Sequence, residues 1–153
     1  MKETRKILAP TDLSELSLAG IRYALEAART SAAEVIVYHS IGADELMHCS
    51  RSELLSDVIG LGEKSLSQFL NARCADLLPH VNVRTKVELG AAAASIVDEA
   101  KRENADLIVM STHGRTGFSH VLVGSVTERV VRHAPCPVLS IHPAKETAAE
   151  AAA

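Results

Sequence analysis

The stretch DLIVMSTHGRTGFSHVLVGS, residues 106–125, is the most informative part of the chain. Residues 106–110 form an almost continuous apolar run, which is typical of a strand buried on both faces of a parallel sheet. A loop containing three glycines follows. Ser125 and Glu128 then have the S-x-x-E spacing of a capping box, which predicts a helix over residues 125–133. A buried strand, a glycine-containing loop and a capped helix in this order indicate a strand–loop–helix unit of an α/β domain.

Outward from this unit, strand-like and helix-like segments alternate along the chain. Apolar and β-branched runs predict strands, and apolar residues at helical spacing predict helices. The expected strands are residues 6–9, 34–39, 81–88, 106–110 and 138–141, and the expected helices are residues 14–30, 54–77, 91–102 and 125–133. This order predicts a three-layer α/β/α sandwich, in which helices cover both faces of a five-stranded, mostly parallel sheet.

Local signals suggest where these elements begin and end. Pro10 is expected to stop the first strand, and Asp12 with Glu15 has the cap-then-acid spacing of a helix start. Residues 42–52 show no clear periodicity and are expected to form a loop. The Ala- and Glu-rich residues 144–153 are expected to fray, so residues 1–143 are predicted to form one domain.

Composition narrows the class of protein. The 153 residues fit one domain, and only 3% of them are aromatic, so the core must be mainly aliphatic. A net charge of −3 provides no basic surface for nucleic acid. No apolar run reaches the length of a membrane span or has the form of a signal peptide, which predicts a cytoplasmic protein. Cys49, Cys74 and Cys136 include no C-x-x-C pair and are expected to be reduced thiols.

Two strand ends carry unusual sequence. Residues 10–12 (PTD) follow the first strand, and residues 110–117 (MSTHGRTG) complete and follow the fourth. In doubly wound sheets, ligands bind beyond the carboxyl ends of the strands, where the strand order reverses. If the first and fourth strands are neighbours, these two ends face each other across one crevice, which is then the expected ligand site.

The loop after the fourth strand has the chemistry of a phosphate site. Gly114 and Gly117 can adopt positive φ, and successive N–H groups in such a turn attract anions. Gly124 precedes a helix whose free N–H groups and dipole favour phosphate, and Ser125 and Thr127 add hydroxyl donors. An ordinary connection, with Ser125 as the helix N-cap, explains the same residues. The loop is neither a Walker A loop nor a G-x-G-x-x-G fingerprint.

Three segments resemble the universal stress protein family: KILAPTD at residues 6–12, LIVMSTHGRTG at 107–117 and LVGSVTERVVRHAPCPVLSI at 122–141. The nucleotide-binding members of that family carry G-x2-G-x9-G-[S/T]. Here Ser111 stands at the first glycine, and Gly114, Gly124 and Ser125 keep the remaining spacing. The resemblance covers roughly residues 6–142. It implies a Rossmann-like sheet of the adenine nucleotide alpha hydrolase type, with strand order 3-2-1-4-5.

The resemblance also implies an ATP site, with Mg²⁺ held mainly by the phosphates. The implied residues at the adenosine end are Pro10, Thr11, Asp12, Ile41 and Met110. The implied residues at the phosphate end are Ser111, Gly114, Arg115, Gly117, Gly124, Ser125, Val126 and Thr127, with Val126 acting through its backbone. Asp12 can equally serve as a helix N-cap, and Ile41 and Met110 can equally be core residues.

Other site chemistries have weaker support in the sequence. His39, His113 and His120 form no H-x3-H helix and no Cys/His cluster, so no dedicated metal site is expected. Asp12, His113 and Ser125 could be drawn as a catalytic triad, but the chain has no G-x-S-x-G elbow, and no catalytic residue is expected.

Three functions remain open at this point. The first is an ATP-binding universal stress protein, a cytoplasmic stress-response regulator or sensor with at most slow ATP hydrolysis. The second is a dimeric adaptor of the same fold that binds no nucleotide, and the third is a slow ATPase or phosphotransferase. The resemblance also favours a homodimer paired through the last strand at Val138, Leu139 and Ile141, which would otherwise be an exposed apolar edge.

Overall fold

Five parallel strands form the centre of the structure, in the order β3-β2-β1-β4-β5. The computed structural model describes residues 3–48, 54–113 and 123–143. The strands are β1 (Lys6–Thr11), β2 (Glu34–Ile41), β3 (Asn82–Leu89), β4 (Leu107–Ser111) and β5 (Val138–Ile141). This topology confirms the predicted sandwich and its strand order.

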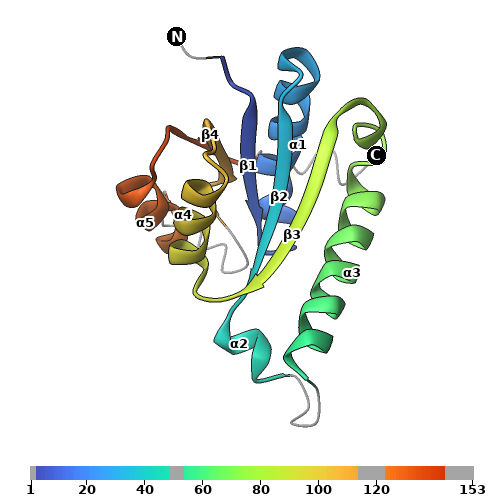
Figure 1. The fold of residues 1–153 in the computed structure, drawn as a ribbon, viewed down its shortest axis with the longest axis vertical. Helices are drawn as coiled ribbons and strands as arrows, with labels where there is room; N and C mark the ends of the chain where they lie inside the picture. Colours follow the sequence, from blue (N-terminus) through green and yellow to red (C-terminus); the bar gives the residue numbers. More distant parts are fainter. Residues whose placement is uncertain (1–2, 49–53, 114–122, 144–153) are drawn as a thin grey trace, which may run out of the picture.

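The helices divide between the two faces of the sheet, as Figure 1 shows. On one face lie α1 (Glu15–Ser31) and α3 (Leu55–Arg73), and on the other lie α4 (Ala92–Arg102) and α5 (Ser125–His133). The short helix α2 (Ala43–Leu46) and the 3-10 helix η1 (Leu78–His80) lie in connections. Successive strand residues enter opposite apolar clusters, so Ile7 and Ala9 pack beneath α1, whereas Leu8 packs beneath α4.

The strand β1 does not stop at Pro10, as the sequence predicted, but continues to Thr11. Its register with β2 runs from Lys6 to Thr11, whereas its register with β4 covers Ile7 and Leu8. Proline has no N–H to donate and is therefore tolerated where a strand has lost one neighbour. The carboxyl ends of β1 and β4 thus separate at the place where the ligand crevice was predicted.

Both predicted N-caps are wrong by one or two residues. Helix α1 begins after Ser14, whose hydroxyl accepts a hydrogen bond from the backbone N–H of Ser17 at 3.2 Å, so Asp12 is not the cap. Gly124, not Ser125, is the N-cap of α5, and the predicted capping box is not formed. Two candidate cap residues stand at each of these helix starts, Asp12 and Ser14 at α1 and Gly124 and Ser125 at α5, and spacing alone does not choose between them.

The connection after β2 also differs from the prediction. Part of the segment expected to be a loop, residues 42–52, forms α2, and α3 ends at Arg73 rather than at residue 77. Cys49 and the expected tail, residues 144–153, lie outside the described residues. Of the helices in the described ranges, none is long and apolar enough to cross a membrane.

Helix α1 is in direct backbone contact with β4 at Gly20. A Cβ atom at this position would lie 2.8 Å from the backbone nitrogen of Ser111 and 2.9 Å from Met110 Cα. The Gly20 N–H also donates a 3.0 Å hydrogen bond to the Ser111 hydroxyl. Glycine permits this close approach, which sets the distance between α1 and the end of β4.

We expect Gly20→Ala to lower the free energy of unfolding by about 1–3 kcal/mol, because the added methyl group meets main-chain atoms that cannot rotate away. Gly60→Ala is the matched control: Gly60 also lies inside a helix, but a Cβ there has no neighbour within 4 Å. The control should gain roughly 0.5–1 kcal/mol from helix propensity. Urea unfolding followed by circular dichroism measures both, and an unchanged or more stable Gly20→Ala variant would contradict the contact.

Candidate functional site

A cavity of about 270 Å³ opens at the carboxyl ends of β1, β2 and β4, where β1 and β4 separate. The first turns of α4 and α5 also border it. It is lined by Pro10, Thr11, Asp12, Ser17, Tyr38, Ser40, Ala92, Ile96, Met110, Ser111, His113, Gly124, Ser125, Val126 and Thr127. The structure therefore brings the two predicted strand ends and the start of α5 to one place.

The residues expected at the site fall into three groups. Those of the β1 end, the β4 end and the start of α5 line the cavity: Pro10, Thr11, Asp12, Met110, Ser111, Gly124, Ser125, Val126 and Thr127. The structure does not bring Ile41 there. Its side chain belongs to the buried cluster beneath α1 and α3, and a Cβ on Gly62 of α3 would lie 2.8 Å from Ile41 Cδ1. The remaining expected residues lie outside the described ranges: Gly114, Arg115 and Gly117.

The end of β1 is held by side-chain hydrogen bonds to the start of α1. The Thr11 hydroxyl accepts from the backbone N–H of Leu13 at 3.0 Å and lies 2.7 Å from the Ser17 hydroxyl. Asp12 Oδ1 accepts from both the backbone N–H and the hydroxyl of Ser14, at 3.0 and 2.5 Å. The Asp12 carboxylate is therefore oriented by the N-cap residue rather than being the cap.

The start of α5 is fixed against the end of β4. The Gly124 N–H donates to the Thr112 carbonyl at 2.6 Å, and the Thr127 hydroxyl donates to the Ser111 carbonyl at 3.0 Å. A Cβ on Gly124 would lie 2.9 Å from the Thr112 carbonyl oxygen. Because the N-cap is glycine, no side chain caps the helix, and the first-turn N–H groups have no acceptor within the helix. These donors border the cavity.

Sequence reasoning missed the contribution of β2. Tyr38 and Ser40 line the cavity, whereas Ile41, assigned to it from the resemblance, lies on the opposite face of the sheet. Residues 38 and 40 share one face because strand side chains alternate. A phenol and a hydroxyl at this spacing, at the carboxyl end of the strand, were the available signal. Ala92 and Ile96 of α4 complete this side of the wall.

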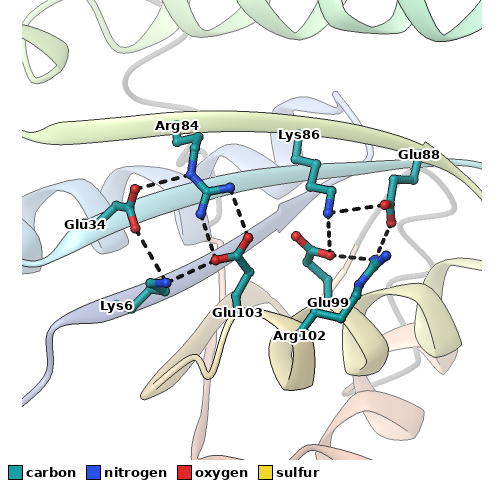
Figure 2. Close-up of polar contacts among 8 residues, drawn as sticks. All are labelled: Lys6, Glu34, Arg84, Lys86, Glu88, Glu99, Arg102 and Glu103. Atoms are coloured by element: carbon teal, nitrogen blue, oxygen red, sulfur yellow. Dashed lines mark hydrogen bonds and ion pairs between the residues drawn. The ribbon is translucent and has the colours of Figure 1, made fainter.

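Beside the cavity, β3 and α4 face each other through charged side chains (Figure 2). Lys86 Nζ lies 2.9 Å from Glu99 Oε2 and 3.3 Å from Glu88 Oε1, and Arg102 Nη2 contacts both carboxylates at 2.5 and 2.6 Å. The Tyr38 hydroxyl donates to Glu88 Oε2 at 2.9 Å. Burial and this hydrogen bond raise the pKa of Tyr38, and Arg102 lowers the pKa of Glu88. The phenol therefore stays a donor, fixed by the ion pairs.

The same interface continues toward the amino ends of the strands. Arg84 donates to both oxygens of Glu103, at 3.0 and 2.8 Å, and to Glu34 Oε1 at 3.2 Å. Lys6 Nζ lies 3.1 Å from Glu103 Oε2 (Figure 2). The hydrogen bonds from Arg84, assisted by Lys6, lower the pKa of Glu103 to about 2. This carboxylate therefore ties β3 and β1 to the end of α4.

We expect Glu103→Gln to flatten the acid dependence of stability. Because the folded-state pKa is depressed, the ionised carboxylate stabilises the fold above the unfolded-state value of about 4.3. That contribution, about 1–2 kcal/mol after allowance for solvent screening, is lost as the pH falls toward 2. Urea unfolding at pH 7 and at pH 3 measures this contribution. Between these two pH values the free energy of unfolding should fall less for the variant than for the native chain.

Glu128→Gln is the control for this measurement, because the Glu128–Arg132 pair is an exposed i,i+4 pair. Such pairs contribute a few tenths of a kcal/mol. If the free energy of unfolding of both Glu103→Gln and Glu128→Gln has the same pH dependence as that of the native chain, the Arg84–Glu103 pair does not stabilise the fold.

The histidines near the site are engaged in hydrogen bonds. His39 is buried, with Nδ1 donating to the Thr11 carbonyl at 2.9 Å. The Thr112 hydroxyl lies 2.9 Å from His113 Nδ1 and 3.1 Å from His142 Nδ1. Across the described residues, no group of three or more His, Cys, Asp or Glu side chains is arranged to hold a metal ion. His120 lies outside those residues.

The fold and the cavity together define a Rossmann-like, doubly wound α/β domain with a crevice at its topological switch point. The model of the universal stress protein family matches residues 3–142, and the chain belongs to this family. Universal stress protein MJ0531 of Methanocaldococcus jannaschii is 33% identical over 145 residues, covering 93% of this chain and 84% of the relative. Universal stress protein MJ0577 of the same organism is 31% identical, covering 90% of this chain and 94% of the relative.

Solved structures show the same fold. MJ0577 aligns with a TM-score of 0.74 and 29% identity, covering 95% of this chain and all of that one. A universal stress protein from Archaeoglobus fulgidus in complex with dAMP aligns with a TM-score of 0.63 and 22% identity, covering 92% of this chain and 99% of that one. An Arabidopsis thaliana member with AMP bound aligns with a TM-score of 0.58 and 22% identity. A universal stress protein in complex with cAMP aligns with a TM-score of 0.64 and 20% identity. At 20–22% identity, the likeness to the structures with dAMP, AMP and cAMP shows a shared fold alone.

Proposed function

We propose that the cavity binds an adenine nucleotide, with ATP as the first candidate. The observation that carries this proposal is the position of the α5 N-terminus. Hydrogen bonds from Gly124 to Thr112 and from Thr127 to Ser111 hold it in the same cavity as Asp12. A helix N-terminus placed there offers N–H groups and a positive dipole end to phosphate. The solved relatives in complex with AMP, dAMP and cAMP support adenine as the base.

In this proposal the phosphates lie at the first turn of α5. Ser125 and Val126 offer their backbone N–H groups, and the exposed Ser125 adds its hydroxyl. The Thr127 hydroxyl already donates to the Ser111 carbonyl, so Thr127 contributes its backbone N–H. Mg²⁺ enters with the nucleotide, because phosphates supply most of its oxygen ligands. Three further residues proposed at the phosphates lie outside the described ranges: Gly114, Arg115 and Gly117.

The adenosine occupies the part of the cavity formed by β1, β2 and β4. Pro10, Thr11 and Met110 form its walls, and the oriented Asp12 carboxylate accepts hydrogen bonds from ribose hydroxyls. The role first proposed for Ile41 is better placed on the side chains of β2 that face the cavity, chiefly Tyr38.

At the level of the cell we propose a stress-response regulator or sensor whose nucleotide occupancy is read by other proteins, with hydrolysis slow or absent. The alternatives are a dimeric adaptor that binds no nucleotide and a slow ATPase or phosphotransferase. We further propose a homodimer formed through β5. This strand is at the edge of the sheet, and Val138, Leu139 and Ile141 on it are only half-buried. Pairing with a second copy would cover this edge.

The first test is whether the protein carries or takes up ATP. We expect protein purified without added nucleotide to release ATP on denaturation, detected by anion-exchange chromatography, or to show a higher melting temperature when ATP and Mg²⁺ are added. Ligand binding to the folded state raises the melting temperature by mass action. If neither signal is found, the adaptor alternative replaces the proposal.

Ser125→Asp separates binding from folding. Ser125 is the first residue of α5, where an acidic side chain complements the helix dipole. We therefore expect unchanged or slightly higher thermal stability, whereas repulsion of the phosphates weakens ATP binding by at least about tenfold, or ~1.4 kcal/mol. Isothermal titration calorimetry measures the affinity, with Ser67→Asp on α3 as the control. Equal ATP affinity in both variants would show that the phosphates do not lie at α5.

A further inference from the structure

Helices α4 and α5 are neighbours on one face of the sheet (Figure 1). A second hollow lies between these two helices. This groove has a volume of about 530 Å³. Ala92 and Ser125, in the first turns of the two helices, and Lys101 and His133, in their last turns, all line it. The two helices therefore run in the same direction, and the groove follows them for the length of α5, ~13 Å at 1.5 Å per residue.

The groove and the cavity are continuous. Ala92, Ser125 and Val126 line both hollows. Their junction is the N-terminus of α5, where the phosphates of the proposed nucleotide lie. A substituent that leaves the phosphates on the side away from the adenosine therefore enters the groove.

The groove combines a narrow apolar surface with a positive edge. Small and apolar side chains line one wall: Ala91 at the N-cap of α4, and residues 92–94 and Val97 within the helix. They leave room that larger side chains would fill. Lys101 lies 3.9 Å from Asp98, whereas no carboxylate in the described part of the chain pairs with Arg129. A bare polyphosphate tail matches the cations but not the alanine wall. A nucleoside offers an apolar ring face together with polar edges, and so matches both.

We infer that the groove takes the second nucleoside of a pyrophosphate-linked adenine dinucleotide. The adenosine occupies the cavity, the pyrophosphate lies at Ser125 and Val126, and the second nucleoside lies against residues 91–94 with Arg129 beside it. The inference rests on the proposed function for the adenosine half and adds a ligand class to it. The groove gives a dinucleotide contacts that ADP lacks, because ADP has the same adenosine and pyrophosphate but no second nucleoside.

Calorimetric titration with ADP and with diadenosine pyrophosphate tests the inference, because the two probes share an adenosine and a pyrophosphate and differ in the second nucleoside. We expect the dinucleotide to bind at least tenfold more tightly than ADP. Arg129→Ala and Ala94→Leu alter residues that line the groove and not the cavity. Each variant should reduce the preference for diadenosine pyrophosphate over ADP to twofold or less, while the affinity for ADP stays within twofold of the native value.

Arg132→Ala is the matched control, because Arg132 is an exposed arginine of α5 that pairs with Glu128 and does not line the groove. It should keep the full preference. If ADP binds and the dinucleotide binds no more tightly, or if the groove variants keep the preference, the groove inference is overturned and the proposed function stands. If neither probe nor ATP binds, the proposed function fails, and the groove inference fails with it.

Discussion

The arrangement of the site depends on Ser111, the last residue of β4, because it joins the helices on the two faces of the sheet. Its hydroxyl accepts a hydrogen bond from the Gly20 N–H of α1, and its carbonyl accepts one from the Thr127 hydroxyl of α5, both at 3.0 Å. Ser111 is buried, so water does not compete for these bonds, which are stronger in such surroundings. Together they fix the N-terminus of α5 relative to the strand ends, and with it the shape of the cavity.

A second constraint is electrostatic and lies at the edge strand β3. Arg84, Lys86 and Glu88 alternate along this strand and point toward α4 (Figure 2). Charged side chains on an edge strand oppose pairing with other chains. Glu99 has no exposed surface, and its Oε1 has no hydrogen-bond partner within the described residues, so the ion pairs of Oε2 with Lys86 and Arg102 offset the cost of burying this side chain. Through Glu88 this array also holds Tyr38, and so stiffens one wall of the cavity.

The five strands and the four longer helices could be predicted because each has its own local signal, whereas the strand order followed from the family resemblance. The buried run at residues 106–110 and the helix at 125–133 lie within one residue of β4 and α5. The site was harder to predict, because tertiary structure sets the face of the sheet on which a side chain lies and the residues that it contacts. Ile41 is adjacent to Ser40 in sequence yet faces α3, since one step along a strand changes the face. The bond between Tyr38 and Glu88 joins residues 50 positions apart, and no local pattern announces it.

The glycine pattern G-x2-G-x9-G-[S/T] has a different physical basis at each described position. Gly124 is required by packing, because a Cβ there would lie 2.9 Å from the Thr112 carbonyl oxygen. The first position tolerates Ser111, whose hydroxyl is hydrogen-bonded to Gly20 of α1. A glycine at 111 would lose that bond and keep the carbonyl that accepts from Thr127. Ser111, which replaces the first glycine of the pattern, therefore attaches α1 to β4 through its hydroxyl and leaves the carbonyl that seats α5 on β4 unchanged.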